Sequence, residues 1–594
     1  MEQEQKVNLA LKRYWQLLVV YLKPHIGLVA LLAIVSILNI ALKLVNPQIV
    51  RFFLDSAEQA APLEKLTQAA ALFMGIALLN QVVQVLVTYL GENIAWLATN
   101  ALRSDLALHC LKLDMSFHKR YKPGELIERV DGDVTQLANF FSQLIIQIGS
   151  NLLLIIGVLV LLWAEDWRIG LSITLAILVG LLVLDWLTKR TIPRWQAVRE
   201  VEARLFGFLE EWLNGTEEIQ TSGAKPFIML RLFESLRARW RKTLSAIRLQ
   251  VLVAILPMNV FMLAYVAAHL LGNTLFRSSL ITIGGLYVIF YYIDTLKGPV
   301  WEIRRQIEDL QRAAASINRI SDLNQEQPSL LDGPGIPELS GPLQVSFDHV
   351  TFQYEDDLDT DILKDIHFQL QPGKVLGLLG RTGSGKTTLT KLILRLHDPI
   401  NGAIRIGPTD GSLYDLRQAQ QTELRRQIAM VTQEVQIFQA TVRQNLTLFD
   451  DTIPDDRIAR VIDQVGLGEW LDALPEGLDT TLEAGGSGLS AGEGQLLAFG
   501  RVFLHSPGLV ILDEASSRLD PATESRLEKA VGELLKDRTG IIIAHRLATV
   551  QRADEIMILK DGRIAEHGPR AELVATPDSL FSSLLRTGME EALV

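Results

Sequence analysis

The chain has 594 residues, too many for one hydrophobic core, so two or more domains are expected. It is 48% hydrophobic with a mean hydropathy of +0.22, and its net charge of −11 and pI of about 5.5 argue against a nucleic-acid partner. The single cysteine, Cys110, excludes an intramolecular disulfide, and no His/Cys cluster has the spacing of a metal site.

The first half contains six apolar segments that are long enough to span a bilayer, or nearly so. An amphipathic stretch over 9–21 precedes them and is typical of an interfacial helix. One such segment alone could be a buried helix of a soluble protein, but six in succession predict an all-α, six-helix transmembrane domain over 1–323. The segments are 27–50, 67–91, 143–163, 169–187, 251–271 and 280–296.

The loops between these segments alternate in character. Short links follow the first, third and fifth segments, whereas long polar stretches at about 92–142 and 188–250 follow the second and fourth. The long stretches are rich in Lys and Arg, so the positive-inside tendency assigns them and both termini to the cytoplasm. Their helical periodicity predicts that the membrane helices continue well into the cytoplasm.

The second half changes pattern after a segment rich in Pro, Gly, Asp and Ser. This segment, 324–343, is expected to be an interdomain linker. From residue 344 to 594, short apolar strands alternate with helices, which predicts an α/β domain with a largely parallel sheet.

A phosphate-binding loop stands near the start of this domain. Residues 380–387 read Gly-Arg-Thr-Gly-Ser-Gly-Lys-Thr, after an apolar strand-like run and before a helix-like run. The glycines let backbone amides curl around a phosphate chain, and the helix N-terminus adds partial positive charge. Lys386 would reach the β- and γ-phosphates, and Thr387 would hold Mg²⁺.

Further polar residues follow apolar strands in the same domain. The strand-like run 509–512 ends in Asp513 and Glu514, which suits a carboxylate beside Mg²⁺ and a general base beside the attacking water. Gln433 and His545 each follow another strand-like run. Either residue alone would more often be structural, but their order around the stronger motifs favours a catalytic site.

Together these motifs resemble an ATP-binding-cassette (ABC) transporter of the exporter type, a half-transporter similar to bacterial multidrug and lipid exporters. The resemblance implies ATP and Mg²⁺ as cofactors, and helices near 116–125 and 214–223 that couple the two domains. The expected nucleotide-binding residues are Tyr354, which matches the adenine-stacking aromatic, Gly380, Arg381, Thr382, Gly383, Ser384, Gly385, Lys386, Thr387, Thr388, Ser490 and Gly492. The expected Mg²⁺ ligands are Thr387, Gln433 and Asp513, and the expected catalytic residues are Glu514, His545 and Gln433.

The resemblance also implies a function. ATP hydrolysis would drive export of an amphipathic small molecule, lipid or peptide by alternating access across the bacterial inner membrane, with the ATP-binding domain in the cytoplasm. An importer on the same fold, for example for siderophores, and an ATP-gated regulator stay open as alternatives. Glu514 and His545 favour turnover over gating.

The signature motif departs from the family pattern. The usual sequence is Leu-Ser-Gly-Gly-Gln, and this chain has Ala491 and Glu493 at the third and fifth places, while Ser490 and Gly492 are kept. In this family the signature of a second copy completes each ATP site, so a second half-transporter is expected as partner. The altered signature beside an intact Glu514 favours a heterodimer, with a homodimer as the alternative.

Overall fold

The computed structural model describes residues 19–142, 149–355, 360–486, 488–513, 521–544 and 550–587. The chain divides into two compact units. The first comprises Met1–Leu111 and Pro123–Glu326, and the second comprises Lys112–Lys122 and Gln327–Val594. The second unit is therefore built from two stretches of chain, one of which comes from the first half of the sequence.

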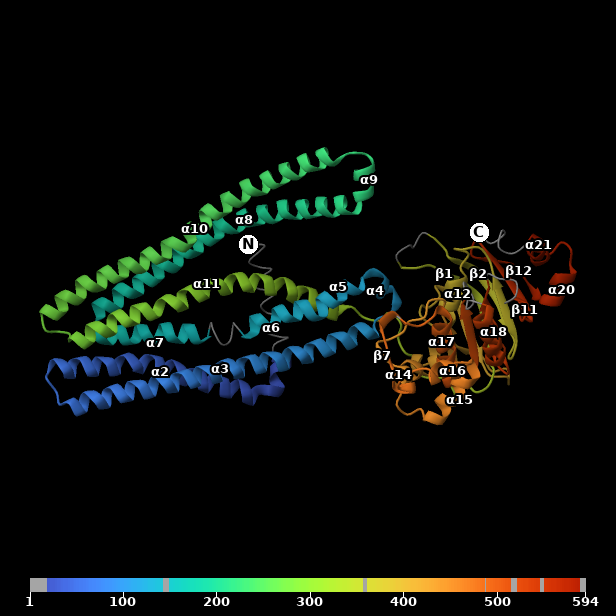
Figure 1. Ribbon diagram of the computed structural model, residues 1–594, viewed down its shortest axis with the longest axis horizontal. Helices are drawn as coiled ribbons and strands as arrows, with labels where there is room; N and C mark the ends of the chain where they lie inside the picture. Colours follow the sequence, from blue (N-terminus) through green and yellow to red (C-terminus); the bar gives the residue numbers. More distant parts are fainter. Residues whose placement is uncertain are drawn as a thin grey trace. The chain divides into compact units, whose positions relative to one another are not determined.

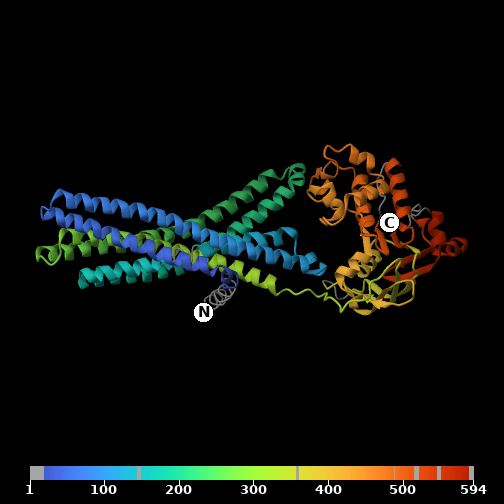
Figure 2. The same cartoon turned by 90° about the horizontal axis from the view of Figure 1, so that it is seen from below.

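The first unit is helical throughout its described residues (Figure 1). Helices α8 and α10 pack along each other, and α11 packs against α2, α6 and α7 (Figures 1 and 2). The elements are η1 (Lys23–His25), α2 (Ile26–Glu58), α3 (Leu63–Lys112), α5 (Pro123–Ile127), the π-helix η2 (Glu128–Asp133), α6 (Val134–Ser142), α7 (Gly149–Glu165), α8 (Trp167–Asn214), α9 (Thr216–Thr221), α10 (Lys225–Arg277) and α11 (Ile283–Gln325).

The long helices confirm a helical membrane region. Helices α2, α3, α8 and α10 are long and apolar enough to cross a bilayer by length and composition, and α7 is a shorter apolar helix. At most 33% of each apolar window is buried inside the protein, so most of this apolar surface faces outward, as a lipid environment requires. The count of six spans stays a prediction, and most of the predicted interfacial helix lies outside the described residues.

The helices extend far beyond a bilayer. Helix α3 has 50 residues and α10 has 53. At 1.5 Å per residue, 50 residues span about 75 Å, more than twice the roughly 30 Å of a hydrocarbon core. The helical periodicity of the long polar stretches is therefore confirmed. The short helix α9 joins α8 to α10 within the predicted range 214–223.

The described residues of the second unit form three sheets. The largest has the order β12-β11-β3-β10-β9-β6, in which all neighbours pair in parallel except β11 and β12. A four-stranded antiparallel sheet has the order β2-β1-β4-β5, and β7 pairs with β8. The strands are β1 (Gln344–Phe352), β2 (Leu363–Leu370), β3 (Val375–Leu379), β4 (Asn401–Gly407), β5 (Tyr414–Asp415), β6 (Ile428–Val431), β7 (Ala440–Thr441), β8 (Thr481–Leu482), β9 (Leu509–Asp513), β10 (Thr539–Ile543), β11 (Glu555–Lys560) and β12 (Arg563–Pro569).

The parallel sheet is buried on both faces. Successive residues of β9 alternate between two hydrophobic clusters, with Leu509 and Ile511 in one and Val510 and Leu512 in the other. Helices on both faces explain why these strands read as continuous apolar runs. The helices of this unit are α4 (Met115–Arg120), α12 (Lys386–Ile393), α13 (Gln421–Gln427), α14 (Val442–Thr447), α15 (Asp455–Val465), α16 (Gly468–Asp472), α17 (Ala491–His505), α18 (Pro521–Leu535), α20 (Arg570–Ala575) and α21 (Leu580–Thr587).

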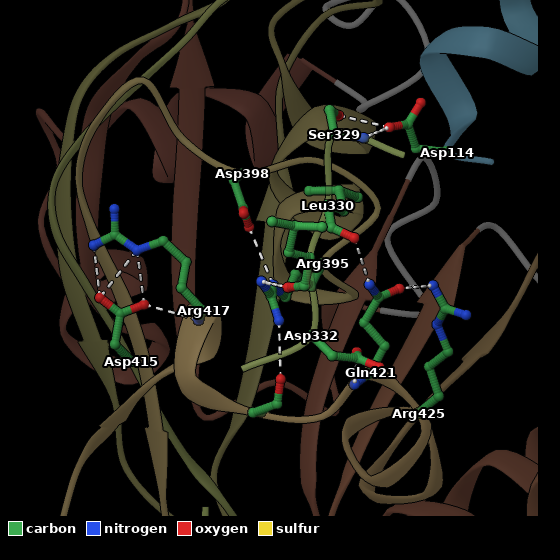
Figure 3. A network of polar contacts seen from close by, with 12 residues as sticks. Asp114, Ser329, Leu330, Asp332, Arg395, Asp398, Asp415, Arg417, Gln421 and Arg425 are labelled. Atoms are coloured by element: carbon green, nitrogen blue, oxygen red, sulfur yellow. Dashed lines mark hydrogen bonds and ion pairs between the residues drawn. The ribbon is translucent and has the colours of Figure 1, made fainter. Parts of the chain in front are cut away.

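The segment predicted as a linker is held by polar contacts within the second unit (Figure 3). Ser329 donates its backbone N–H and its hydroxyl to the Asp114 carboxylate, at 2.7 and 2.6 Å. Arg395, which is buried, donates to the Leu331 carbonyl at 2.8 Å. Gln421 donates its backbone N–H to Asp332 at 2.9 Å. The first part of this segment is therefore docked on the second unit and does not run free.

Candidate active site

Parallel strand pairing gathers the predicted site residues at one edge of the large sheet. Ile543 of β10 is paired with Leu378 of β3 on one side and with Asp513 of β9 on the other. On β6, Val431 is paired with Leu512. The carboxyl ends of β3, β6, β9 and β10 therefore meet, and ligands of open α/β sheets bind at such an edge.

The loop between β3 and α12 has the backbone of a phosphate cradle. Gly380, Gly383 and Gly385 all have positive φ angles, of 149°, 82° and 105°. A Cβ at Gly380 would clash with the Leu559 carbonyl oxygen, and one at Gly385 would lie 2.6 Å from Leu363 Cδ2. Only glycine fits these positions, and the loop leads directly into the N-terminus of α12, where backbone N–H groups favour an anion.

The side chains of this loop fit a phosphate group. Lys386 is only 6% exposed, and its ammonium donates to the carbonyl oxygens of Gly380 and Arg381. The Ser384 hydroxyl is buried and has no hydrogen-bond partner among the described residues. The N-terminus of α12 also lacks a side-chain cap. A buried cation, a buried hydroxyl with no partner among the described residues and a helix N-terminus without a side-chain cap are together the donor set that a phosphate chain requires.

The predicted Mg²⁺ ligands follow or end three strands whose carboxyl ends lie at the same edge of the sheet. Thr387 is the second residue of α12 and is exposed. Asp513 ends β9 and is half-buried. Gln433 follows β6 by two residues and is exposed. Hydroxyl, carboxylate and amide oxygens are the ligands that Mg²⁺ prefers, so these three donors fit the ion.

Tyr354 lies beside the phosphate loop. Its hydroxyl is 3.1 Å from the Thr388 hydroxyl on α12. Its ring makes edge contacts with Phe352 at 5.0 Å and with His397 at 5.3 Å between ring centroids. Burial, reinforced by the nearby Lys391, lowers the pKa of His397, so this imidazole is neutral at pH 7.

A basic cavity adjoins Tyr354, and this cavity was not predicted from the sequence. Its volume is about 630 Å³, and it is lined by Met115, Ser116, His118, Lys119, Arg120, Tyr354, Glu355, Lys391 and His397. Lys119 on α4 places its Nζ 4.9 Å from the centroid of the Tyr354 ring. The ring face that an adenine could use is thus contacted by a lysine of the first long loop. The basic run at 118–120 was visible in the sequence, but its contact with Tyr354 was not.

The altered signature forms a complete capping box at the start of α17. The Ser490 hydroxyl accepts the backbone N–H of Glu493 at 3.2 Å. In return, Glu493 Oε2 accepts the Ser490 backbone N–H at 2.7 Å and the Ser490 hydroxyl at 2.8 Å. The carboxylate therefore binds the hydroxyl that is expected to meet phosphate. The Ser-x-x-Glu spacing could have revealed this box from the sequence alone.

The structure brings together only some of the predicted residues. The loop 380–388, Gln433 and Asp513 adjoin the six-stranded sheet, and Tyr354, which follows β1 of the four-stranded sheet, contacts Thr388 of α12. Ser490 caps a different helix and is exposed. Glu514 and His545 lie outside the described residues.

Comparison with known proteins assigns the chain to a family. The family model "ABC transporter transmembrane region" matches residues 26–300, and the model "ABC transporter" matches residues 363–517. A fatty acid ABC transporter ATP-binding/permease protein of Mycobacterium bovis is 31% identical over 80% of this chain and 74% of its own length. A multidrug resistance ABC transporter ATP-binding and permease protein of Lactococcus lactis subsp. cremoris is 28% identical over 94% of this chain and 92% of its own length.

A solved structure has the same fold. A bacterial Atm1-family ABC exporter with ATP bound matches with a TM-score of 0.75 and 23% identity, over 94% of this chain and 98% of the other. A helical membrane region followed by an α/β nucleotide-binding domain is thus confirmed. The chain belongs to the ABC transporter family, as an exporter-type half-transporter whose ATP-binding domain hydrolyses ATP to drive transport.

Proposed function

We propose that this chain is one half of a dimeric exporter that moves an amphipathic small molecule, lipid or peptide out across a bacterial inner membrane by alternating access. The observation that carries the proposal is the meeting of the phosphate loop, Asp513 and the segment of Gln433 at one sheet edge, in a chain whose other unit consists of long apolar helices. The bacterial relatives support the inner membrane as its location, with the ATP-binding unit in the cytoplasm.

Each site residue has a role in this proposal. Lys386 neutralises the β- and γ-phosphates, and Tyr354 stacks on adenine. Thr387, Gln433 and Asp513 hold Mg²⁺, which when bound offsets the charge that develops on the phosphates. Glu514 orients the attacking water and accepts its proton, and His545 senses the γ-phosphate.

The dimer supplies what one chain lacks. Ser490 and Gly492 of each chain face the γ-phosphate of nucleotide held by the partner chain. The carboxylate of Glu493, hydrogen-bonded to Ser490, places negative charge beside that position, and this supports a weaker second site. We therefore favour a heterodimer, in which this chain's own phosphate loop meets the standard signature of a different half-transporter.

The cargo proposal rests on two observations. The relatives named above are described as a fatty acid transporter and a multidrug resistance transporter. The apolar windows of the membrane helices are mostly unburied within the chain, so this apolar surface is available to membrane lipid. Both observations favour a cargo that reaches the protein from the bilayer.

Reconstitution into vesicles tests this function. Chains with the ATP-binding unit outside should carry a fluorescent fatty acid or amphipathic dye into the lumen only with ATP, and a Glu514→Gln control should not. Movement in the opposite sense would support an importer, and ATP binding with no flux and no turnover would support a regulator. Native mass spectrometry of the complex isolated from its own membrane reports one or two kinds of subunit. A homodimer with robust transport would exclude the heterodimer.

A further inference from the structure

A cluster of two histidines and an aspartate lies on β1 and β2 of the antiparallel sheet, and none of its members belongs to the ATP site. In the pairing of these strands, Phe347 faces Phe368 and Val350 faces Ile366. Between these two pairs, β1 has two residues, Asp348 and His349, where β2 has only His367. This is a β-bulge, a feature that redirects side chains.

The bulge brings three potential metal ligands together. The rings of His349 and His367 are stacked, with centroids 4.8 Å apart and planes 22° apart. His367 Nδ1 lies 3.9 Å from Asp348 Oδ1. One ligating atom from each of the three residues lies within 4.8 Å of the others. Within the described residues, no other group of three His, Cys, Asp or Glu side chains meets this condition.

The backbone at the cluster is strained. His349 has a φ of 50° and Asp365, on the opposite strand, has a φ of 58°. A non-glycine residue in this left-handed region is strained and persists only where its surroundings hold it there. The two strained residues hold each other, since Asp365 Oδ1 accepts a hydrogen bond from His349 Nδ1 at 2.6 Å. Backbone outliers of this kind concentrate at functional positions.

We infer that Asp348, His349 and His367 form a surface site for a divalent transition-metal ion such as Zn²⁺, with Asp365 as a positioning residue for His349. Imidazole and carboxylate ligands select Zn²⁺, Cu²⁺ or Ni²⁺, whereas Mg²⁺ and Ca²⁺ prefer oxygen ligands. The site is therefore chemically distinct from the Mg²⁺ position beside the phosphate loop.

One neighbour of the cluster would orient a metal-binding histidine, and another would compete with the ion for the aspartate. A histidine that binds a metal usually donates its second ring N–H to a carboxylate, which fixes the ring and its tautomer. Asp365 accepts that hydrogen bond from His349 Nδ1, so Nε2 is left as the ligand. Arg405 Nη1 lies 2.9 Å from Asp348 Oδ2 and competes with an ion for this carboxylate. The histidines are exposed, so an ion can enter from solvent and keep water as further ligands.

Zinc binding to the full-length protein tests the site. The protein is purified without a histidine tag, stripped with a chelator, placed in nanodiscs and titrated with Zn²⁺ in excess Mg²⁺. We expect one Zn²⁺ per chain in the wild type and at least about tenfold weaker binding in His349→Ala and His367→Ala. Asp365→Asn should also weaken Zn²⁺ binding about tenfold, within the range known for carboxylates that are hydrogen-bonded to a metal-binding histidine. His505→Ala, a change to an exposed histidine outside the cluster, should leave binding unchanged.

Arg405→Gln separates a metal site from a purely structural cluster. If Arg405 competes for Asp348, its removal tightens Zn²⁺ binding, whereas loss of a structural ion pair would loosen it. A Co²⁺ titration of the same variants reports ligand type through its visible absorption spectrum. Wild-type Zn²⁺ affinity in both histidine variants, or no bound Zn²⁺ in the wild type, would overturn the proposal, and normal ATPase activity of the variants shows that they are folded.

Discussion

The charge of Glu493 should weaken the ATP site to which this chain contributes its signature. Glu493 Oε2 lies 2.8 Å from the Ser490 hydroxyl. If that hydroxyl turns its proton to a phosphate oxygen at about 2.7 Å while the Ser490 backbone N–H holds the carboxylate in place, the carboxylate lies at most about 5.5 Å from the phosphate charge. At this distance the repulsion is about 0.8 kcal/mol in a water-like medium and about 3 kcal/mol at an effective dielectric constant of about 20.

Glu493→Gln removes the charge and keeps the capping box, because glutamine serves at this position of the box as well as glutamate. We therefore expect ATP affinity at that site to rise between about fourfold and about 150-fold. The measurement is binding of a fluorescent ATP analogue to the assembled dimer, with Glu514→Gln as the background so that hydrolysis at this chain's own phosphate-loop site does not interfere. The gain should shrink as salt is raised from 0.05 to about 0.5 M, since screening weakens charge effects.

Two control variants isolate the charge. Glu493→Ala removes both the charge and the side-chain half of the capping box that Glu493 supplies, so its melting temperature should fall while that of Glu493→Gln should not. Glu533→Gln removes an exposed charge on α18 and should change neither quantity. An unchanged ATP affinity in Glu493→Gln, at low salt and in a folded dimer, would refute the view that this carboxylate faces phosphate.

Three further predictions concern the ATP site. Glu514→Gln should bind ATP but hydrolyse it at least about a hundredfold more slowly, a loss of about 2.7 kcal/mol in transition-state stabilisation; near-normal single-site turnover would remove Glu514 from its role. Tyr354→Ala should raise the apparent KM for ATP and Tyr354→Trp should preserve it, because stacking requires a π-face; equal KM values for wild type and Tyr354→Ala would make Tyr354 only structural. Lys119→Met should lower the KM for ATP about two- to fivefold, because adenine would no longer have to displace an ammonium group whose contact with the Tyr354 ring, at 4.9 Å, contributes about 0.5–1 kcal/mol. Lys122→Met, on the same loop, should leave this KM unchanged, and a higher KM in Lys119→Met would mean that Lys119 assists nucleotide binding.

The sequence predicted those parts of the site that depend on strand order. The phosphate loop, Gln433 and Asp513 each follow an apolar run, and parallel strands bring their carboxyl ends together. The positive φ angles at Gly383 and Gly385 were also predictable from the sequence, because the phosphate-loop motif requires glycine at these positions.

Contacts between distant segments were not predictable in this way. Lys119 and Tyr354 are far apart in the chain, and no periodicity connects them. The search for His/Cys spacing missed His349 and His367 because a bulge in the pairing of two strands, and not their sequence spacing, brings them together. The linker over 324–343 was identified by its composition, but composition could not show that Ser329 and Asp332 are hydrogen-bonded to the second unit.

The division of the chain into units has a consequence for its covalent connectivity. The backbone passes from one unit to the other three times, after Leu111, after Lys122 and after Glu326. A protease cut between residues 333 and 343 would therefore leave the C-terminal fragment attached through the hydrogen bonds from Arg395 to Leu331 and from Gln421 to Asp332, and through the contact of Lys119 with Tyr354. Conversely, a truncated protein that starts at residue 344 would lack residues 112–122 and 327–343 of its own unit, and with them α4 and the contacts that it makes.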